Sequence, residues 1–142
     1  MSDRTFVDTN VLIYAHDLDA GERHGVAARI VAALWETRRA VISTQVLQEF
    51  YVNATRKIPS PLTRAAARQL VKVYAAWQTE LVGPAEILLA SELEEQHLLS
   101  FWDALIVASA LKGGASTILT EDMSPGRSIS GVRIQNPFAT AT

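Results

Sequence analysis

Short apolar runs alternate along this chain with longer segments in which apolar residues recur at helical spacing. The runs Thr5–Val7, Ala40–Ile42 and Thr117–Thr120 have the length and the β-branched content of buried strands. We expect a further short strand at Leu81–Val82 and a last one at Gly131–Ile134. Because helical segments separate most of these runs, the pattern predicts an α/β fold with a mainly parallel central sheet that helices cover on both faces.

The first two helices are predicted from their N-terminal signals and their apolar spacing. Asp19 and Glu22 have the spacing of a capping box, and the apolar positions that follow favour a long helix up to Arg39. A second helix is expected after the strand at 40–42, with Ser43 or Thr44 as its cap.

Three more helices are predicted further along the chain. Ser60 and Pro61 are a cap and a proline suited to the first helical position, and they predict a helix through about Gln78. Another helix is expected to begin at Gly83, which a proline follows. Residues 101–111 are apolar almost all the way round a helix, which predicts that this helix is buried on most sides.

Five carboxylates lie beside these apolar segments although they are far apart in sequence: Asp8, Glu49, Asp103, Glu121 and Asp122. A buried carboxylate without a counter-charge is costly, so it becomes protonated, pairs with a base or binds a metal cation. The runs around Asp8 and Glu49, and the run 101–111, contain no Lys or Arg. A hard divalent ion, Mg²⁺ or Mn²⁺, is therefore the expected partner. In parallel sheets, ligands bind beyond the carboxyl ends of strands, where Asp8 and Asp122 are predicted to lie.

Each acid also has an interpretation that requires no metal. Asp8 could cap a turn or a helix, and Glu49 could lie on the polar edge of its helix. Ser100 and Asp103 have the spacing of a helix cap, a role that Asp103 could combine with metal binding. The adjacent acids at 121–122 could be solvated loop residues. The joint pattern, more than any single acid, points to a metal site.

Composition restricts the class of protein. The chain has 142 residues, 49% of them hydrophobic, which is enough for one core, and no segment has the composition of a linker. We therefore expect one domain over residues 1–142. The absence of cysteine excludes disulfides and thiolate metal sites. No targeting segment precedes Asp8, and no apolar run approaches the roughly 20 residues of a membrane helix, so we expect a soluble, cytoplasmic protein without membrane contact.

Four segments, in order, resemble the motifs of the PIN-domain nucleases, and within that family those of the VapC-type toxins of bacterial toxin-antitoxin pairs. Residues 6–14 (FVDTNVLIY) resemble the opening motif, and residues 45–50 (QVLQEF) resemble the second acidic motif. Residues 101–106 (FWDALI) are similar to the third motif and residues 119–123 (LTEDM) to the fourth. The ending GVRIQNPF at 131–138 is also similar to that of many members, so the resemblance covers almost the whole chain.

The resemblance implies a three-layer α/β/α PIN fold and a metal-dependent endoribonuclease that hydrolyses RNA phosphodiester bonds. Asp8 and Asp103 would bind Mg²⁺ or Mn²⁺ directly, while Glu49 would bind the ion or orient a water. Asp122 would act through a water or a second ion, unless a shift of one position puts Glu121 in its place. The residues implied to support these carboxylates by hydrogen bonding are Thr9, Asn10 and Thr120, with Glu121 beside them.

An acidic site repels RNA, so a nuclease of this kind needs a basic surface for its substrate. The formal net charge of −2 argues against general coating of nucleic acid, but residues 50–79 contain no acid. Within them Arg64, Arg68 and Lys72 recur every four residues, which places them along one face of the predicted helix. We expect this stripe to bind RNA, with a solvated outer face as the equally weighted alternative.

The aromatic residues are expected to pack rather than to bind bases. Trp35, Trp77 and Trp102 lie in apolar helical patterns, which favours packing in the core or at an interface. The domain has much apolar helical surface for its size, including Trp35, Trp77, Tyr51 and Tyr74, part of which a twofold partner could bury. The resemblance implies the same homodimer, and also a cognate antitoxin protein that inhibits it by inserting a basic side chain among the acids.

Two other functions remain as alternatives. A PIN-fold interaction module without catalytic activity would not need the four acidic motifs, all of which are intact. An aspartate-dependent phosphatase also has an aspartate after its first strand, but it would need another acid two positions later, where this chain has Asn10.

Overall fold

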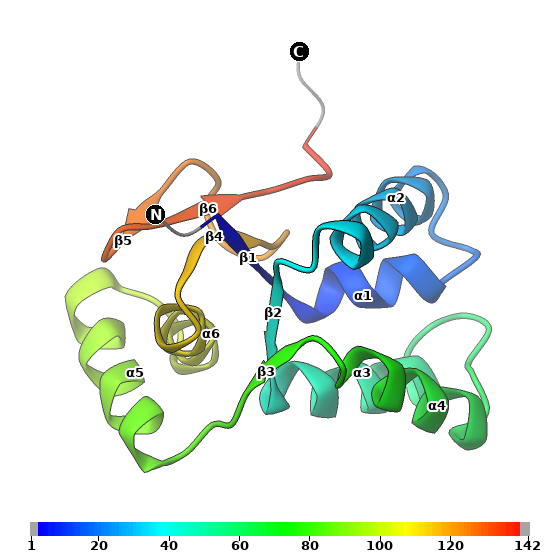
Figure 1. Ribbon diagram of the computed structural model, residues 1–142, viewed down its shortest axis with the longest axis horizontal. Helices are drawn as coiled ribbons and strands as arrows, with labels where there is room; N and C mark the ends of the chain where they lie inside the picture. Colours follow the sequence, from blue (N-terminus) through cyan, green and yellow to red (C-terminus); the bar gives the residue numbers. More distant parts are fainter. Residues whose placement is uncertain (1–2, 140–142) are drawn as a thin grey trace.

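The computed structural model describes residues 3–139, which form one sheet with helices around it (Figure 1). The strands are β1 (Arg4–Val7), β2 (Ala40–Ser43), β3 (Gln78–Glu80), β4 (Ala115–Leu119), β5 (Ser128–Ile129) and β6 (Val132–Gln135). The helices are α1 (Thr9–His16), α2 (Glu22–Thr37), α3 (Thr44–Arg56), α4 (Arg64–Tyr74), α5 (Pro84–His97) and α6 (Phe101–Lys112). Among these described residues, no helix has the length and apolar content needed to cross a membrane.

The strand order in the sheet is β3-β2-β1-β4-β6-β5, and every neighbouring pair is parallel except β5 with β6. From β1 the chain adds β2 and then β3 at one side, with α1 to α4 on one face of the sheet (Figure 1). It then returns to β4 through α5 and α6, which lie on the opposite face (Figure 1). The prediction of a mainly parallel sheet with helices on both faces, in three layers, is confirmed. The direction of winding reverses between β1 and β4, and such switch points are where ligands bind.

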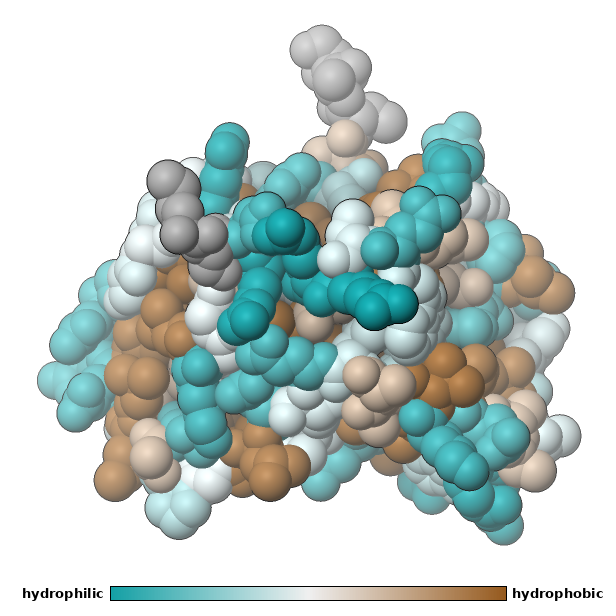
Figure 2. Space-filling model, viewed as in Figure 1, coloured by the Kyte–Doolittle hydropathy of each residue, from teal (hydrophilic) through white to brown (hydrophobic). Residues whose placement is uncertain are grey.

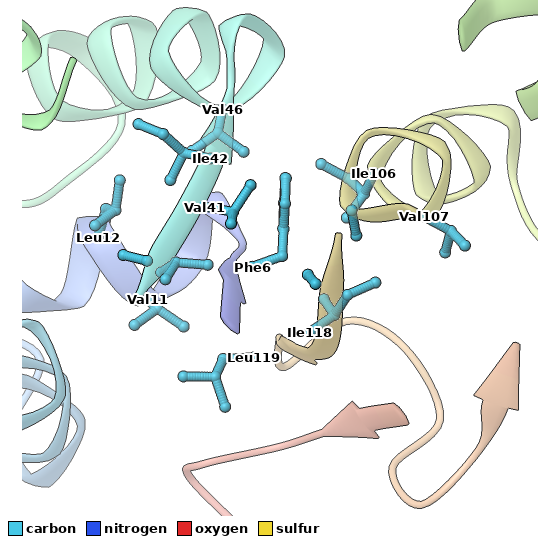
Figure 3. Close-up of a cluster of buried hydrophobic side chains, with 14 of the residues drawn as sticks. Phe6, Val11, Leu12, Val41, Ile42, Val46, Ile106, Val107, Ile118 and Leu119 are labelled. Carbon is cyan, nitrogen blue, oxygen red and sulfur yellow. The ribbon is translucent and has the colours of Figure 1, made fainter. Parts of the chain in front are cut away.

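The hydrophobic core lies on both sides of the strands β2, β1 and β4 (Figure 3). Figure 3 shows Phe6, Val41 and Ile118 of these strands beside α6, with residues of α1 on the other side. The buried side chains that α6 and α1 contribute are Ile106, Val107, Val11 and Leu12. In α6 every residue from Ala104 to Ala110 is buried, so the prediction of a helix enclosed on most sides is confirmed.

The capping box predicted at Asp19 is wrong. Helix α2 begins at Glu22 after Gly21, whose positive φ of 64° suits a residue without a side chain, and no side chain caps this helix. The Asp19 carboxylate instead accepts a hydrogen bond from the hydroxyl of Ser60 at 2.9 Å. This contact joins two loops 41 residues apart, so tertiary structure determines the role of Asp19.

The helix predicted from Ser60 to Gln78 is shorter at both ends. It begins at Arg64, because Thr63 is the residue whose hydroxyl accepts a hydrogen bond from the N–H of Ala66. It ends at Tyr74 in a turn, where the N–H of Trp77 donates to the Tyr74 carbonyl. The turn frees the following residues to join the sheet.

The short edge strand lies three residues before its predicted position at Leu81–Val82. Strand β3 pairs Gln78 with Val41 and Glu80 with Ser43, so it consists of polar residues. An edge strand has a neighbour on one side only and can remain solvated, which explains why hydrophobicity did not indicate it. The two-residue strand β5 was not predicted, and β4 and β6 lie within two residues of their expected positions.

Candidate active site

The four acids of the sequence motifs line one pocket, of about 230 Å³, at the switch point. Asp8 follows β1 and Asp122 lies in the loop after β4, while Glu49 comes from α3 and Asp103 from the first turn of α6. Among the described residues that line this pocket there is no Lys or Arg. Parallel pairing of Val7 with Leu119 aligns the ends of β1 and β4, which brings residues 8 and 122 to the same edge of the sheet.

Asp8 is the most enclosed of these acids, with 5% of its surface exposed. Its Oδ1 accepts a hydrogen bond from the N–H of Thr9 at 2.7 Å, and its Oδ2 accepts one from the hydroxyl of Thr120 at 2.7 Å. It is therefore both the N-cap of α1 and a wall of the pocket. Burial raises the pKa of Asp8 to about 6, with a smaller contribution from the negative charges of Asp122 and Glu49, although both hydrogen bonds oppose the rise.

Asp103 likewise combines two roles. Its backbone N–H donates to the hydroxyl of Ser100 at 3.1 Å, which confirms the predicted cap of α6, and its half-buried carboxylate lines the pocket. Burial raises the pKa of Asp103, the hydrogen bond with Ser100 opposes this, and the charge of Asp122 adds to it. Asp103 and Asp122 are therefore close enough for their charges to interact.

Glu49 faces the pocket rather than the polar edge of α3. Its Oε1 accepts a hydrogen bond from the hydroxyl of Thr9 at 2.8 Å. Thr9 thus contacts two acids, since its backbone N–H donates to Asp8 and its side chain donates to Glu49. Thr9, which is buried at the start of α1, therefore fixes the position of Asp8 relative to Glu49.

The adjacent acids Glu121 and Asp122 have different surroundings. Asp122 lines the pocket, and its Oδ2 accepts a hydrogen bond from the side-chain amide of Asn10 at 3.0 Å. Glu121 accepts hydrogen bonds from the Tyr14 hydroxyl and from Nε of Arg23, both at 2.6 Å. Burial would raise the pKa of Glu121, but these two hydrogen bonds and the charge of Arg23 outweigh it and leave the pKa below its usual value. Glu121 already has a cationic partner, whereas Asp122 has none among residues 3–139.

The chemistry of the donors fits a hard divalent cation. They are carboxylate oxygens at a pocket without basic side chains, and burial makes the ionised form of Asp8 unfavourable until a positive charge compensates it. Within residues 3–139, however, no group of three or more His, Asp and Glu side chains is placed so that it could hold a metal ion as it stands. Like charges repel one another, so a cation between these carboxylates would allow their ionised forms to approach more closely.

The structure also brings to the pocket three residues that sequence reasoning missed or placed elsewhere. Gln45 and Asn53 line it together with Glu49, four residues away in either direction on α3, and this spacing in the sequence could have revealed them. Trp102 lines it too and is 64% exposed, so of the two roles predicted for it, packing in the core or at an interface, packing in the core is wrong. Trp35 and Trp77 pack against each other, with their ring centroids 4.9 Å apart.

The basic stripe of Arg64, Arg68 and Lys72 is exposed on α4, as expected, but none of its residues lines the acidic pocket. Arg68 instead borders a second, mainly apolar groove with Leu47 and Tyr51 of α3, the helix that carries Glu49. The stripe is therefore separated from the acids by the width of α3.

Solved structures of other proteins are similar to this fold. VapC20 of Mycobacterium tuberculosis, described as a sarcin-ricin loop cleaving toxin, is 25% identical, with 83% of this chain and 91% of that chain covered and a TM-score of 0.64. A chain of a toxin-antitoxin complex from Klebsiella pneumoniae is 20% identical, with coverage of 96% and 99% and a TM-score of 0.69. A chain of VapBC2 from Rickettsia felis, in a structure with a DNA fragment from the VapBC2 promoter, is 17% identical. The match covers 93% of this chain and 97% of that chain, with a TM-score of 0.63.

A search of the curated proteins found no match to this sequence. The family model described as the PIN domain matches residues 5–124, a range that includes the strands β2, β3 and β4, all of β1 except Arg4, and all four acids of the pocket. Because this match covers well over half of the chain, the protein belongs to the PIN domain family.

Proposed function

We propose that this protein is an endoribonuclease that acts as the toxin of a toxin-antitoxin pair and uses a divalent cation, Mg²⁺ or Mn²⁺. The main support is the convergence of Asp8, Glu49, Asp103 and Asp122 from four separate segments on one pocket without a basic side chain. The resemblance to VapC20, a toxin that cleaves the sarcin-ricin loop, is consistent with RNA as the substrate. The family match favours a nuclease over a phosphatase.

In this proposal Asp8 and Asp103 bind the cation directly, because burial raises the pKa of each carboxyl and a bound cation would favour its ionised form. Glu49 binds it as well or orients the attacking water, and Asp122 acts through a water or at a second ion. When bound, the cation neutralises charge on the phosphoryl oxygens and makes a water more acidic. The carboxylates need to be ionised for this role, so the raised pKa of Asp8 makes cation binding pH-dependent.

The polar neighbours of the acids act by orienting them. Thr120 and Thr9 each donate a hydrogen bond to an oxygen of Asp8, Thr9 also donates to Glu49, and Asn10 donates to Asp122. With these bonds in place each carboxylate keeps at least one oxygen lone pair free for a cation. Glu121 does not belong to this set, because it is engaged by Tyr14 and Arg23.

RNA is held by surfaces outside the acidic pocket. The basic residues of α4 are Arg64, Arg68 and Lys72. Because α4 packs against α3, an RNA strand bound along these residues can cross α3 to reach Glu49. Phosphate contacts position the strand without reading its sequence.

We further propose a homodimer that a cognate antitoxin inhibits. The surface over α5 is partly apolar (Figure 2), with Ile87 and Leu88 exposed by 45% and 67% and Leu81 by 68% just before this helix. A second copy that covered these residues would remove this surface from water. An arginine of the antitoxin suits the acidic pocket, since a guanidinium can bridge two carboxylates.

Cleavage of purified RNA by wild-type protein and by Asp8→Asn, in Mn²⁺ and in EDTA, tests the nuclease. We expect cleavage by the wild type in Mn²⁺ only and none by the variant. Mapping of RNA ends in cells that briefly express the chain then identifies the target, which we expect to be one or a few sharp sites. Cleavage that persists in EDTA, or equal cleavage by Asp8→Asn, would contradict the proposal.

Expression of the chain alone tests the toxin, and light scattering tests the dimer. We expect arrested growth that a protein encoded beside this chain relieves, with the two proteins purifying together. We expect the mass of a dimer at micromolar concentration. Normal growth with no co-purifying protein would leave a PIN nuclease with another role, and the mass of a monomer would remove the dimer.

A further inference from the structure

Trp102 is unusual among the aromatic residues because it is both exposed and next to the acids. It lies in the first turn of α6, directly before Asp103, with 64% of its surface exposed. Its side chain lines the acidic pocket and also a neighbouring pocket of about 380 Å³ bordered by α3, α5 and α6. Phe101 supports it edge-on, with the ring centroids 5.3 Å apart and the planes at 79°. The indole therefore separates two adjoining hollows, one acidic and one mainly apolar.

Gln45 borders the same two pockets and has an unmet hydrogen-bonding need. It is 6% exposed, and its Nε2 donates to the carbonyl of Trp102 at 3.4 Å. Its Oε1 is buried and has no hydrogen-bond partner among the described residues. The Trp102 carbonyl fixes which end of the amide is the oxygen, because an oxygen placed there would face another acceptor. A buried acceptor without a partner is unfavourable, so Oε1 is suited to receive an N–H group from a ligand.

We propose that Trp102 and Gln45 form a nucleobase subsite of the RNA-cleaving site. A base next to the cleaved phosphate stacks on the indole, and Oε1 of Gln45 accepts a hydrogen bond from the exocyclic amino group of that base. Adenine, cytosine and guanine have such a group, whereas the donor on the pairing edge of uracil is the ring N3–H, which lies between two carbonyl oxygens that the acceptor Oε1 would also face, so this subsite disfavours uracil. This inference rests on the proposed ribonuclease function and adds to it a specific preference at one nucleotide.

Two physical features make a base the fitting occupant. Every base has an aromatic face that stacks on indole, and Trp102 is the neighbour of an acid at which the phosphate would be cleaved. A second copy of this chain is the competing occupant, since Ile87 also borders the apolar pocket and is 45% exposed. An apolar dimer contact, however, would cover the indole and leave Oε1 of Gln45 without a donor.

Steady-state cleavage of short single-stranded RNA tests the stacking. We expect Trp102→Ala to raise KM by about tenfold to a hundredfold, the loss typical of one base–aromatic stack, with a smaller change in kcat. Trp102→Phe keeps an aromatic face and should restore most of the affinity. Leu18→Ala is the matched control, because Leu18 is an apolar side chain that is 80% exposed but lines neither pocket, and it should leave KM unchanged.

Base preference tests Gln45. With oligonucleotides that differ only by cytosine or uracil beside the cleaved bond, we expect the wild type to prefer cytosine and Gln45→Leu to lose this preference. Tryptophan emission should fall when the wild type binds a single-stranded RNA oligonucleotide in EDTA, where no cleavage is expected, and Trp102→Phe should show little of this quenching. Circular dichroism confirms that each variant is folded.

The outcomes separate this inference from the proposed function. A wild type that cleaves no RNA overturns the ribonuclease proposal, and with it this subsite. A wild type that cleaves RNA while Trp102→Ala keeps the same KM overturns the subsite alone. If light scattering shows that Trp102→Ala becomes monomeric and Leu88→Ala does the same with an equal rise in KM, Trp102 belongs to a dimer contact and the subsite is wrong.

Discussion

The hydroxyl of Thr120 donates a hydrogen bond of 2.7 Å to Oδ2 of Asp8, although 112 positions separate the two residues in the chain. The same hydroxyl oxygen accepts a hydrogen bond from the backbone N–H of Asp122 at 3.1 Å. Thr120 is fully buried, so it holds two acids of the pocket in a fixed relation without access to water. It lies at the end of β4, where the parallel pairing with β1 brings it opposite Asp8.

Replacement of Thr120 by Val removes this donor with little change in volume. The loss of the hydrogen bond should raise the pKa of Asp8 further and weaken cation binding by about 10- to 100-fold, the usual effect of losing such a supporting bond. The Mn²⁺ concentration that gives half-maximal cleavage measures this. Thr120→Ser keeps the hydroxyl and should behave nearly as the wild type. Equal values for Val and Ser would show that the hydroxyl has no part in the site.

The raised pKa of Asp8 predicts how the stability of the cation-free protein depends on pH. Because the folded-state pKa of about 6 lies above the ordinary 3.8, the protonated form favours folding, and that stability is lost as pH rises through 6. The free energy of unfolding should therefore fall by up to roughly 3 kcal/mol between pH 4 and pH 7 from this group. Urea unfolding in EDTA at several pH values measures it. Asp8→Asn should lose this component and be more stable than the wild type at pH 7.

A divalent cation should reverse that destabilisation. Binding to the folded state alone raises the free energy of unfolding by about 2.7 kcal/mol at a hundred times the dissociation constant. We expect Mn²⁺ to raise the melting temperature of the wild type at pH 7.5 and to do so less at pH 5, where more Asp8 is protonated. Asp103→Asn should show a reduced shift. An unchanged melting temperature in Mn²⁺ for the wild type would argue that these acids do not bind the ion.

Glu121→Gln and Asp122→Asn should differ although the two residues are adjacent. Asp122 lines the pocket, so its variant should lose most cleavage, whereas Glu121 contacts Tyr14 and Arg23 and its variant should retain it. Arg23 is half exposed, so solvent screens its ion pair with Glu121 and the stability of Glu121→Gln should change little. Cleavage rates in saturating Mn²⁺ compare the two variants. Equally small effects of the two substitutions on cleavage would show that another residue has the role proposed for Asp122.

Combined replacement of Arg64, Arg68 and Lys72 by Ala should weaken RNA binding and make it less dependent on salt. Each lost phosphate contact lowers the slope of log affinity against log salt by roughly 0.7 for a single strand. Titrations at several salt concentrations measure this, and the exposed Arg29 on α2 supplies a control substitution. A slope that stays at the wild-type value would assign this stripe to a solvated helix face.

The sequence alone was enough for the elements whose signals are local. The apolar runs at β1, β2 and β4 and the uniformly apolar α6 were predicted because burial of a strand or helix leaves its mark on consecutive residues. The caps at Ser43 and Ser100 are equally local, since each side chain bonds a backbone group three residues on. The four acids could be proposed as one site because each is attached to such an element and the family resemblance orders them.

Tertiary structure decided what depends on contacts between distant segments. Asp19 has the spacing of a cap but bonds Ser60, and the polar strand β3 exists because β2 offers it an edge. Trp102 lies in an apolar pattern yet remains exposed, because its position in the first turn of α6 borders the pocket. Glu121 and Asp122 are both carboxylates, and their roles differ because they have different hydrogen-bond partners. Hydrogen bonds and burial between residues a hundred positions apart leave no periodic signal in a sequence, so these features required the folded chain.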